Sequence, residues 1–419
     1  MSTTTQLPDS RAFGPVPRTG VIYVMERAAE LGYTPGHPDW ANLGQGAPET
    51  GPLDGSPPRL DTVPVVASSS EYAPVAGLPE LRQAVADLYN HRYRKGKASK
   101  YGPRNVAIAA GGRTALTRVA AALDRVHLGH FLPDYTAYEE LLDLFRDFLP
   151  IPILLRDRCL PNAARLREEI VGRGLGALLL SNPCNPTGDV VFGDELARWV
   201  DAGRETGCAL IFDEFYSHYL YGDAAEVGTN SAAAHVEDVD ADPVLVVDGL
   251  TKNWRYPGLR LSWTLGPERV IRALASAGSF LDGGAPHPVQ AAAVELIEPG
   301  RADAEARSIQ AEFSAKRRYM IERLRGMGLG LEHEPLGGFY AFVSLEGLPA
   351  RLQDGTDFFE AGLERRVITI PGRFFDVNPG KRRSHIPSRL HGFVRLSFGP
   401  ARAELERGLD RLEELIATG

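Results

Sequence analysis

Cysteine is scarce in this chain of 419 residues, which contains only Cys159, Cys184 and Cys208. Three scattered cysteines exclude a disulfide framework and a paired-cysteine metal site, and they indicate a reducing compartment. No apolar run approaches the ~20 residues that a membrane-spanning helix requires. The first residues also lead into no apolar segment of the kind that directs secretion. These absences predict a cytoplasmic protein with no metal site.

The chain also lacks an excess of positive charge. Lysine and arginine number 46 against 54 aspartate and glutamate residues, so the net charge is −8, and no basic stripe is interleaved with aromatic residues. Nucleic acid and membrane are therefore not expected as partners. The 43% hydrophobic and 24% charged contents are ordinary for a globular enzyme. A disordered tail is expected only as a polar N-terminal stretch through about Pro17.

Short apolar runs alternate with amphipathic stretches between residues 105 and 266. The runs are near-continuously hydrophobic, which is typical of strands that are covered on both faces in a mostly parallel sheet. We expect these strands at residues 106–110, 176–180, 209–212, 244–247 and 259–263. We expect helices between them at residues 114–124, 138–148, 162–173 and 195–206. This alternation predicts an α/β domain of three layers with a mostly parallel sheet.

The pattern changes after Leu274 toward a smaller α+β lobe. Helices are expected there at residues 308–325 and 402–416, and strands at residues 339–343, 367–370 and 394–398. A further helix, expected near the start at residues 20–31, could pack on either lobe. Residues 374–391 are rich in arginine, lysine, proline and histidine and are expected to form a long loop. We expect residues 1–50 to form an arm that joins the smaller lobe, residues 51–295 the large domain, and residues 296–419 the small C-terminal domain.

The residues around Lys252 indicate a specific chemistry. A lysine at the end of an apolar strand suits a Schiff base with an aldehyde cofactor, whose pyridine ring then draws off the electrons of a carbanion. Asp213, at the end of the strand 209–212, could keep the ring nitrogen protonated. Tyr216 and Asn185 could donate hydrogen bonds to the phenolic oxygen of the ring. Asp213 could otherwise cap a helix and Asn185 could occupy a turn, but together they favour pyridoxal phosphate chemistry.

A second group of residues suits the phosphate of such a cofactor. The turn Gly111-Gly112 follows a strand and begins a helix, so its amides and the helix N-terminus form an anion site. Arg260 could pair with the phosphate through two hydrogen bonds. Tight turns require glycine in any case, and Arg260 could instead form a structural salt bridge.

These motifs resemble those of fold type I pyridoxal-phosphate enzymes, specifically the aminotransferase class I/II family. The resemblance extends from Asn42–Gly46 to Phe393–Phe398. It is most specific in Asn182–Gly188, in Asp213–Tyr216 and in the spacing from Thr251-Lys252 to Arg260. It implies that Lys252 carries the Schiff base and shuttles the proton, with an amino acid as substrate and a 2-oxo acid as possible acceptor.

The resemblance also implies roles for further residues. Tyr135 would stack on the cofactor ring, and Arg395 would bind the substrate α-carboxylate in a pocket that Gly46 lines. Tyr72 would reach the phosphate of a neighbouring subunit, which implies a homodimer with shared sites. Thr251, Gly111, Gly112 and Arg113 would adjoin the cofactor.

Several positions depart from the family pattern. Family members usually carry serine at the position of Gly249, so one hydroxyl donor to the phosphate is missing. Arg113 occupies a position where small or amide residues are commoner, and it could contact either phosphate or substrate. Trp254 and Arg255 are also unusual. The basic loop at residues 374–391 is either a solvated surface loop or a lid that recognises an anionic or large substrate.

Two reactions remain open at this point. Transamination to a 2-oxo acid is the leading hypothesis. The unusual residues make an elimination, replacement or ring closure the alternative hypothesis, for example on S-adenosylmethionine or another specialised amino acid. A regulator with an aminotransferase-like domain is not expected, because the resemblance begins by about Gly20 and leaves no room for a DNA-binding module.

Overall fold

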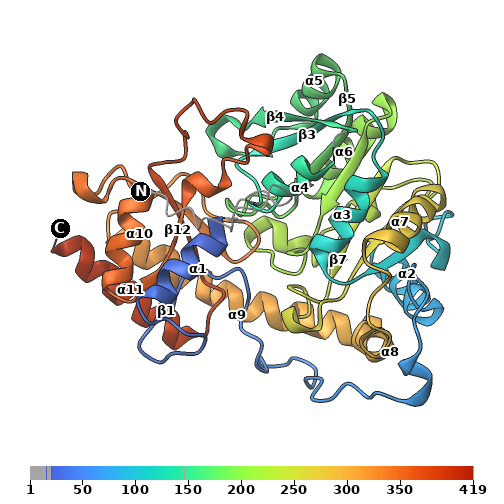
Figure 1. Cartoon of the computed structure of the whole chain (residues 1–419), viewed down its shortest axis with the longest axis horizontal. Coiled ribbons are helices and arrows are strands. Elements are labelled where there is room, and N and C mark those ends of the chain that lie inside the picture. Colours follow the sequence, from blue (N-terminus) through green and yellow to red (C-terminus); the bar gives the residue numbers. More distant parts are fainter. Residues whose placement is uncertain (1–15, 17–19, 146, 419) are drawn as a thin grey trace, which may run out of the picture.

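A computed structural model describes residues 16, 20–145 and 147–418 of the chain (Figure 1). The polar N-terminal stretch through about Pro17 lies almost wholly outside the described residues. Figure 1 shows a larger α/β part beside a smaller lobe, with the long helix α9 (Pro299–Gly326) running along the lower edge of both. Among the described residues, no helix is long and apolar enough to cross a membrane.

A seven-stranded sheet forms the centre of the larger part. Its strands run in the order β2 (Val106–Ala109), β8 (Ser262–Leu265), β7 (Val244–Gly249), β6 (Ala209–Asp213), β5 (Leu175–Ser181), β3 (His127–Leu132), β4 (Leu149–Leu154). Only β8 is antiparallel to its neighbours β2 and β7, and the other pairs are parallel. The expected mostly parallel α/β sheet is confirmed.

Strands β3 and β4 were not predicted from the sequence. Strand β3 contains Gly129 and two histidines, and β4 contains Pro150 and Pro152, so neither has the composition of a typical strand. The prolines are tolerated because β4 lies at the edge of the sheet, where some backbone amides need no partner.

Helices cover both faces of this sheet. Neighbouring residues of one strand enter separate cores: Leu179 of β5 packs in one and Leu178 in the other. The first core also receives α3 (Gly112–Ala122), α4 (Tyr138–Leu144) and α7 (Glu268–Leu281). The second receives α2 (Pro79–Tyr93), α5 (Ala163–Arg173), α6 (Gly193–Thr206) and α8 (His287–Leu296). This arrangement explains why the strands are apolar on both faces.

The smaller lobe combines both ends of the chain. Its four-stranded sheet runs in the order β12 (Ile370–Pro371), β13 (Phe393–Ser397), β10 (Tyr340–Ser344), β9 (Gly330–Leu331). Strand β1 (Ala41–Asn42) pairs with β11 (Val367–Ile368), and the lobe also holds α1 (Gly20–Glu30), α10 (Gly355–Glu364) and α11 (Arg402–Ala417). The β1–β11 pairing supports the proposed placement of residues 1–50 with this lobe, and we keep the three-part division as a proposal.

The parallel strands end together at one edge of the large sheet. Ser181 at the end of β5 is in register with Asp213 at the end of β6, and Asp213 in turn with Val247 of β7. Some expected boundaries are wrong: α9 begins at Pro299 rather than residue 308, and α4 ends at Leu144 rather than residue 148. Strand β8 begins at Ser262 rather than Leu259, because residues 257–259 form a 3-10 turn. Arg260 therefore lies in the connection before β8, with a left-handed φ of 49°.

Candidate active site

A pocket of about 390 Å³ lies where β5, β6 and β7 end beside the first turn of α3. Its lining includes most of the residues predicted for the site: Gly112, Arg113, Tyr135, Asn185, Asp213, Tyr216, Thr251, Lys252 and Arg260. Leu116, Ser181 and Phe215 complete the lining and were not predicted. Of the other predicted residues, Gly111, Gly46 and Arg395 contact residues of the lining, whereas Tyr72 is 97% exposed and does not line the pocket.

Lys252 follows β7 by three residues and extends its amine into this pocket. Its Nζ donates a hydrogen bond to the carbonyl oxygen of Gly46. Burial lowers the pKa of Lys252 to about 7, and the positive charges of Arg260, Arg395 and Arg113 add to the shift. Asp213 acts in the opposite direction. A lysine with this pKa is partly uncharged at neutral pH and is able to act as a nucleophile or a base.

Asp213 is buried at the end of β6. Its Oδ2 accepts a hydrogen bond of 2.9 Å from the hydroxyl of Tyr138, the first residue of α4. Burial raises the pKa of Asp213 to about 6, against the lowering effects of Tyr138, the Phe215 backbone amide and Lys252. The sequence reading missed Tyr138 because it appeared only as the start of a helix. No signal in the sequence marks this contact, because the two residues lie 75 positions apart.

Asn185 contacts both a residue predicted to bind the cofactor and the arginine predicted to bind the substrate carboxylate. Its Nδ2 lies 3.4 Å from the hydroxyl of Tyr216, and its Oδ1 accepts a hydrogen bond of 2.9 Å from the Nη1 of Arg395. The Nη2 of Arg395 donates to the Gly44 carbonyl at 2.7 Å, and its guanidinium lies 4.1 Å from the centre of the Tyr340 ring. The predicted cofactor contacts and the predicted carboxylate-binding arginine are therefore neighbours.

The other end of the pocket is shaped for an anion. A side chain at Gly111 would put its Cβ 2.3 Å from Nη2 of Arg260, and one at Gly112 would lie 2.6 Å from the Phe215 ring. Gly111 also has a φ of 93°, which favours glycine. The buried Thr251 hydroxyl has no hydrogen-bond partner among the described residues. A helix N-terminus, an unpartnered hydroxyl and the exposed Arg260 together fit a phosphate group.

Packing explains two departures from the family pattern. A Cβ at Gly249 would lie 2.5 Å from the Leu261 carbonyl oxygen and 2.6 Å from the Cα of Ser262, so the close approach of β8 excludes a side chain there. Trp254 is buried between Trp263 and His218, and its Nε1 donates to the Leu296 carbonyl at 3.0 Å. Both residues serve the packing around the lysine turn rather than the pocket.

The basic loop is held against the outside of α4. Lys381 pairs with Glu139 and, at 3.3 Å, with Glu140, while Arg383 pairs with Asp376 at 2.7 Å. None of the loop residues lines the pocket around Lys252. A 3-10 turn at Gly372–Phe375 leads into the loop, and a second lies within it at Pro379–Lys381. These contacts favour the surface-loop interpretation over the lid.

We expect Asp213→Asn to stabilise the cofactor-free protein at pH 7. An acid whose pKa is raised by folding, here from 3.8 to about 6, destabilises the folded state as the pH rises through that interval. Asparagine removes this penalty and still accepts the Tyr138 hydrogen bond. The free energy of unfolding in urea should rise by about 1–3 kcal/mol at pH 7, and the gain should shrink toward pH 4. Asp61→Asn, at an exposed position, is the control, and a loss of stability at pH 7 would contradict this account.

Comparison with known proteins agrees with the geometry. Residues 39–412 match the family model for aminotransferase class I and II. The probable aspartate/prephenate aminotransferase of Aquifex aeolicus is 25% identical over 354 residues, which cover 83% of this chain and 84% of that protein. The aspartate aminotransferase of Streptomyces avermitilis is 28% identical over 362 residues, which cover 83% of this chain and 81% of that protein.

Solved structures have the same fold. An aminotransferase from Mycobacterium tuberculosis superposes with a TM-score of 0.78 at 26% identity, over 96% of this chain and 98% of that one. Aspartate aminotransferase from Thermus thermophilus with maleate superposes with a TM-score of 0.75 at 24% identity, over 97% of this chain and 98% of that one. The family match covers most of the chain, and members of this family depend on pyridoxal phosphate. The chain belongs to the class I and II aminotransferases and is a pyridoxal-phosphate-dependent transferase that acts on amino acids and 2-oxo acids.

Proposed function

We propose that Lys252 is the catalytic residue of a transamination that favours amino acids with an acidic side chain. The observation that carries this proposal is the amine of Lys252, which has a pKa near 7 and shares one pocket with Asp213 and Arg260. Arg395 adjoins this pocket through Asn185, which lines it. Pyridoxal phosphate, when bound, supplies an aldehyde and a pyridine ring that accepts electrons. Lys252 would hold the cofactor through its amine and move the proton at the substrate α-carbon.

The remaining polar residues would orient the cofactor ring. Asp213 would pair with the ring nitrogen, because a buried carboxylate is stabilised by a positive partner. Asn185 and Tyr216 could donate to one oxygen between them, since their polar atoms lie 3.4 Å apart. Tyr135 would cover a face of the ring and is itself packed edge-on against Tyr138.

Two anion sites would fix the ends of the reacting molecule. Thr251, Arg260 and the backbone of Gly111 and Gly112 would hold the phosphate. Arg395 would bind the substrate α-carboxylate next to Gly46. The Nε of Arg395 is buried and has no hydrogen-bond partner among the described residues, which leaves one donor for that carboxylate.

Arg113 supports a preference for acidic side chains. It is exposed at the pocket and has one long side-chain contact, 3.5 Å to the Tyr135 hydroxyl, so its charge is available. Several relatives are named aspartate aminotransferases. No comparison supports elimination, replacement or ring closure, and packing or ion pairs account for Gly249, Trp254 and the basic loop.

We further propose a homodimer with shared sites. Tyr72 is 97% exposed in the single chain, which is unusual for a large aromatic side chain. The carbonyl oxygen of Glu71 lies 3.0 Å from Nδ1 of His287, so Tyr72 and the turn at residues 283–287 share one face. Both could reach the pocket of a partner. The proposed cytoplasmic location rests on the sequence features described above, of which the low cysteine content is one.

A half-reaction tests the transamination. Loaded enzyme given aspartate without an acceptor should convert its cofactor to the amine form and release one 2-oxo acid, as followed by absorbance. Lys252→Ala should lower the rate by about 10,000-fold or more, because it removes both nucleophile and base. Ammonia or a cyclic product in place of the 2-oxo acid would refute transamination.

The side-chain preference is tested with Arg113→Met. Because one charge-assisted pair contributes about 1.5–3 kcal/mol, kcat/KM for aspartate should fall by about 10- to 100-fold while that for asparagine changes by less than about threefold. Arg260→Met is the comparison, and it should weaken cofactor retention and reduce both substrates alike. If Arg113→Met behaves in the same way as Arg260→Met, Arg113 binds phosphate and the preference is wrong.

The shared site is tested by mixing two inactive proteins. Lys252→Ala removes the amine and Tyr72→Ala the residue proposed to reach the partner, so a mixed dimer contains one complete site. Random exchange of subunits should restore about a quarter of the wild-type activity. Sedimentation provides the oligomeric state, and a monomer at micromolar concentration, or a mixture as inactive as its parts, would contradict the proposal.

A further inference from the structure

A buried arginine follows the active-site lysine in the same turn. The side chain of Arg255 is fully buried, and its backbone amide donates to the Lys252 carbonyl at 3.0 Å. Arg255 has a φ of 57°, in the left-handed region that residues other than glycine and asparagine seldom adopt. Such a conformation costs about 1–3 kcal/mol and persists only where surrounding contacts hold it. The contacts of the guanidinium are therefore informative.

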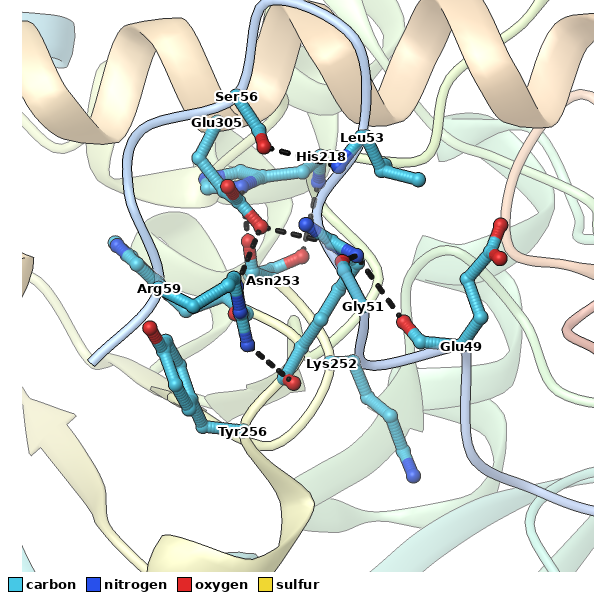
Figure 2. A network of polar contacts seen from close by, with 12 residues as sticks. Glu49, Gly51, Leu53, Ser56, Arg59, His218, Lys252, Asn253, Tyr256 and Glu305 are labelled. Atoms are coloured by element: carbon cyan, nitrogen blue, oxygen red, sulfur yellow. Dashed lines mark hydrogen bonds and ion pairs between the residues drawn. The ribbon is translucent and has the colours of Figure 1, made fainter. Parts of the chain in front are cut away.

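The guanidinium of Arg255 connects the lysine turn, which carries it, to two other segments of the chain. Its Nε donates to Oε1 of Glu305 in α9 at 2.8 Å. Its Nη1 donates to the carbonyl oxygens of Gly51 at 2.5 Å and Glu49 at 3.2 Å. We call residues 46–60 the strap, and Figure 2 shows it curving around this network and arching across α9 at the top of the view. Arg255 thus ties the strap to both the lysine turn and the long helix.

Arg59 fastens the far end of the strap to the same turn. Its Nη1 donates to the Trp254 carbonyl at 3.0 Å and its Nη2 to the Arg255 carbonyl at 2.8 Å. Its guanidinium lies 3.6 Å from the centre of the Tyr256 ring, and the Tyr256 hydroxyl accepts from the amide of Leu60 at 2.6 Å. The strap is therefore attached to the lysine turn at two places.

The other flank of the turn is anchored in the large domain. Asn253 donates through Nδ2 to Oδ1 of Asp248 at 2.7 Å and to the Glu214 carbonyl at 3.0 Å. Figure 2 shows the side chain of Lys252 pointing away from these contacts. The residues that follow Lys252 fix the position of its backbone, while its side chain extends into the pocket.

The strap contributes directly to the environment of the lysine amine. It begins at Gly46, whose carbonyl accepts from Lys252 Nζ. It contains no helix or strand, so a small number of side-chain and backbone contacts fix its position. Besides the Arg255 and Arg59 contacts, these include the Glu49 amide to the Gly399 carbonyl at 2.8 Å and Arg301 to the Pro58 carbonyl at 2.5 Å.

We propose that Arg255 is a positioning residue for the reaction. Together with Glu305 and Arg59 it holds the strap so that the backbone of Gly46 lies against the amine of Lys252. The substrate-binding part of this inference rests on the proposed function, in which Gly46 lines the pocket for the α-carboxylate. Loss of the guanidinium would release the strap and displace Gly46 without removing any group that touches the reacting atoms.

Arg255→Asn separates this role from a purely structural one. Asparagine tolerates the left-handed backbone, so the turn is retained while the contacts to Glu305, Glu49 and Gly51 are lost. Arg94→Asn is the matched control. Arg94 is also fully buried and donates to backbone carbonyls, including those of Ala233 and Val236 at 3.0 and 2.7 Å, and none of its contacts is to the strap.

Hydrogen exchange on the full-length holoenzyme is the first measurement. In Arg255→Asn, amides in peptides covering residues 46–60 should exchange about tenfold faster or more, because charge-assisted hydrogen bonds that held them are absent. Arg94→Asn should leave these peptides unchanged. This readout needs no substrate, so it stands even if the proposed preference for acidic amino acids fails.

Steady-state kinetics are the second measurement. Displacement of Gly46 should raise KM for the donor amino acid about tenfold with a smaller change in kcat, whereas Arg94→Asn should leave both unchanged. Arg255→Lys keeps the charge but cannot reach Glu305 and both carbonyls together, so it should also loosen the strap, and it replaces the asparagine variant if that one does not fold. Unchanged exchange and unchanged KM in either folded variant would overturn the proposal.

Discussion

The amine of Lys252 is held where a positive charge is unfavourable, and the rest of the site depends on that constraint. Burial and three arginines lower its pKa to about 7, and the carboxylate of Asp213 opposes them. An exposed lysine would stay protonated near neutral pH and would be a poor nucleophile. The charges come from different structural elements: Asp213 from a parallel strand, Arg260 from the connection before β8, and Arg395 from the smaller lobe. The fold is needed to bring them together.

The unusual residues near Lys252 act on packing and position rather than on a different reaction. The close approach of β8 excludes a side chain at Gly249, and Trp254 is packed between two aromatic rings. Lys381 of the basic loop pairs with the first turn of α4, outside the pocket. Taken from the sequence alone, these features leave elimination and ring closure open as hypotheses. With a physical reason for each, they no longer argue against ordinary transamination.

The sequence predicted residues whose role follows from their place at a strand end. Lys252, Asp213 and Asn185 each follow an apolar run, and parallel strands end at one edge, so their convergence was predictable. Strands β3 and β4 were missed because their histidines, glycine and prolines are tolerated only in this sheet context. Tyr138 and Arg255 were missed as functional residues for another reason. Their partners lie 75 and 50 residues away in sequence, and no local pattern encodes such contacts.

Some groups proposed to hold the cofactor or the substrate are incompletely paired within the chain. Asp213 is buried with a raised pKa, and the Thr251 hydroxyl and the Arg395 Nε have no partner among the described residues. Buried groups of this kind each cost on the order of 1–3 kcal/mol. A ligand that satisfies Asp213 and Thr251 together therefore stabilises the fold as it binds. Two variants compared as purified would differ in stability partly through their cofactor content. A substitution in this pocket consequently reveals its effect on folding only when the cofactor-free forms are compared.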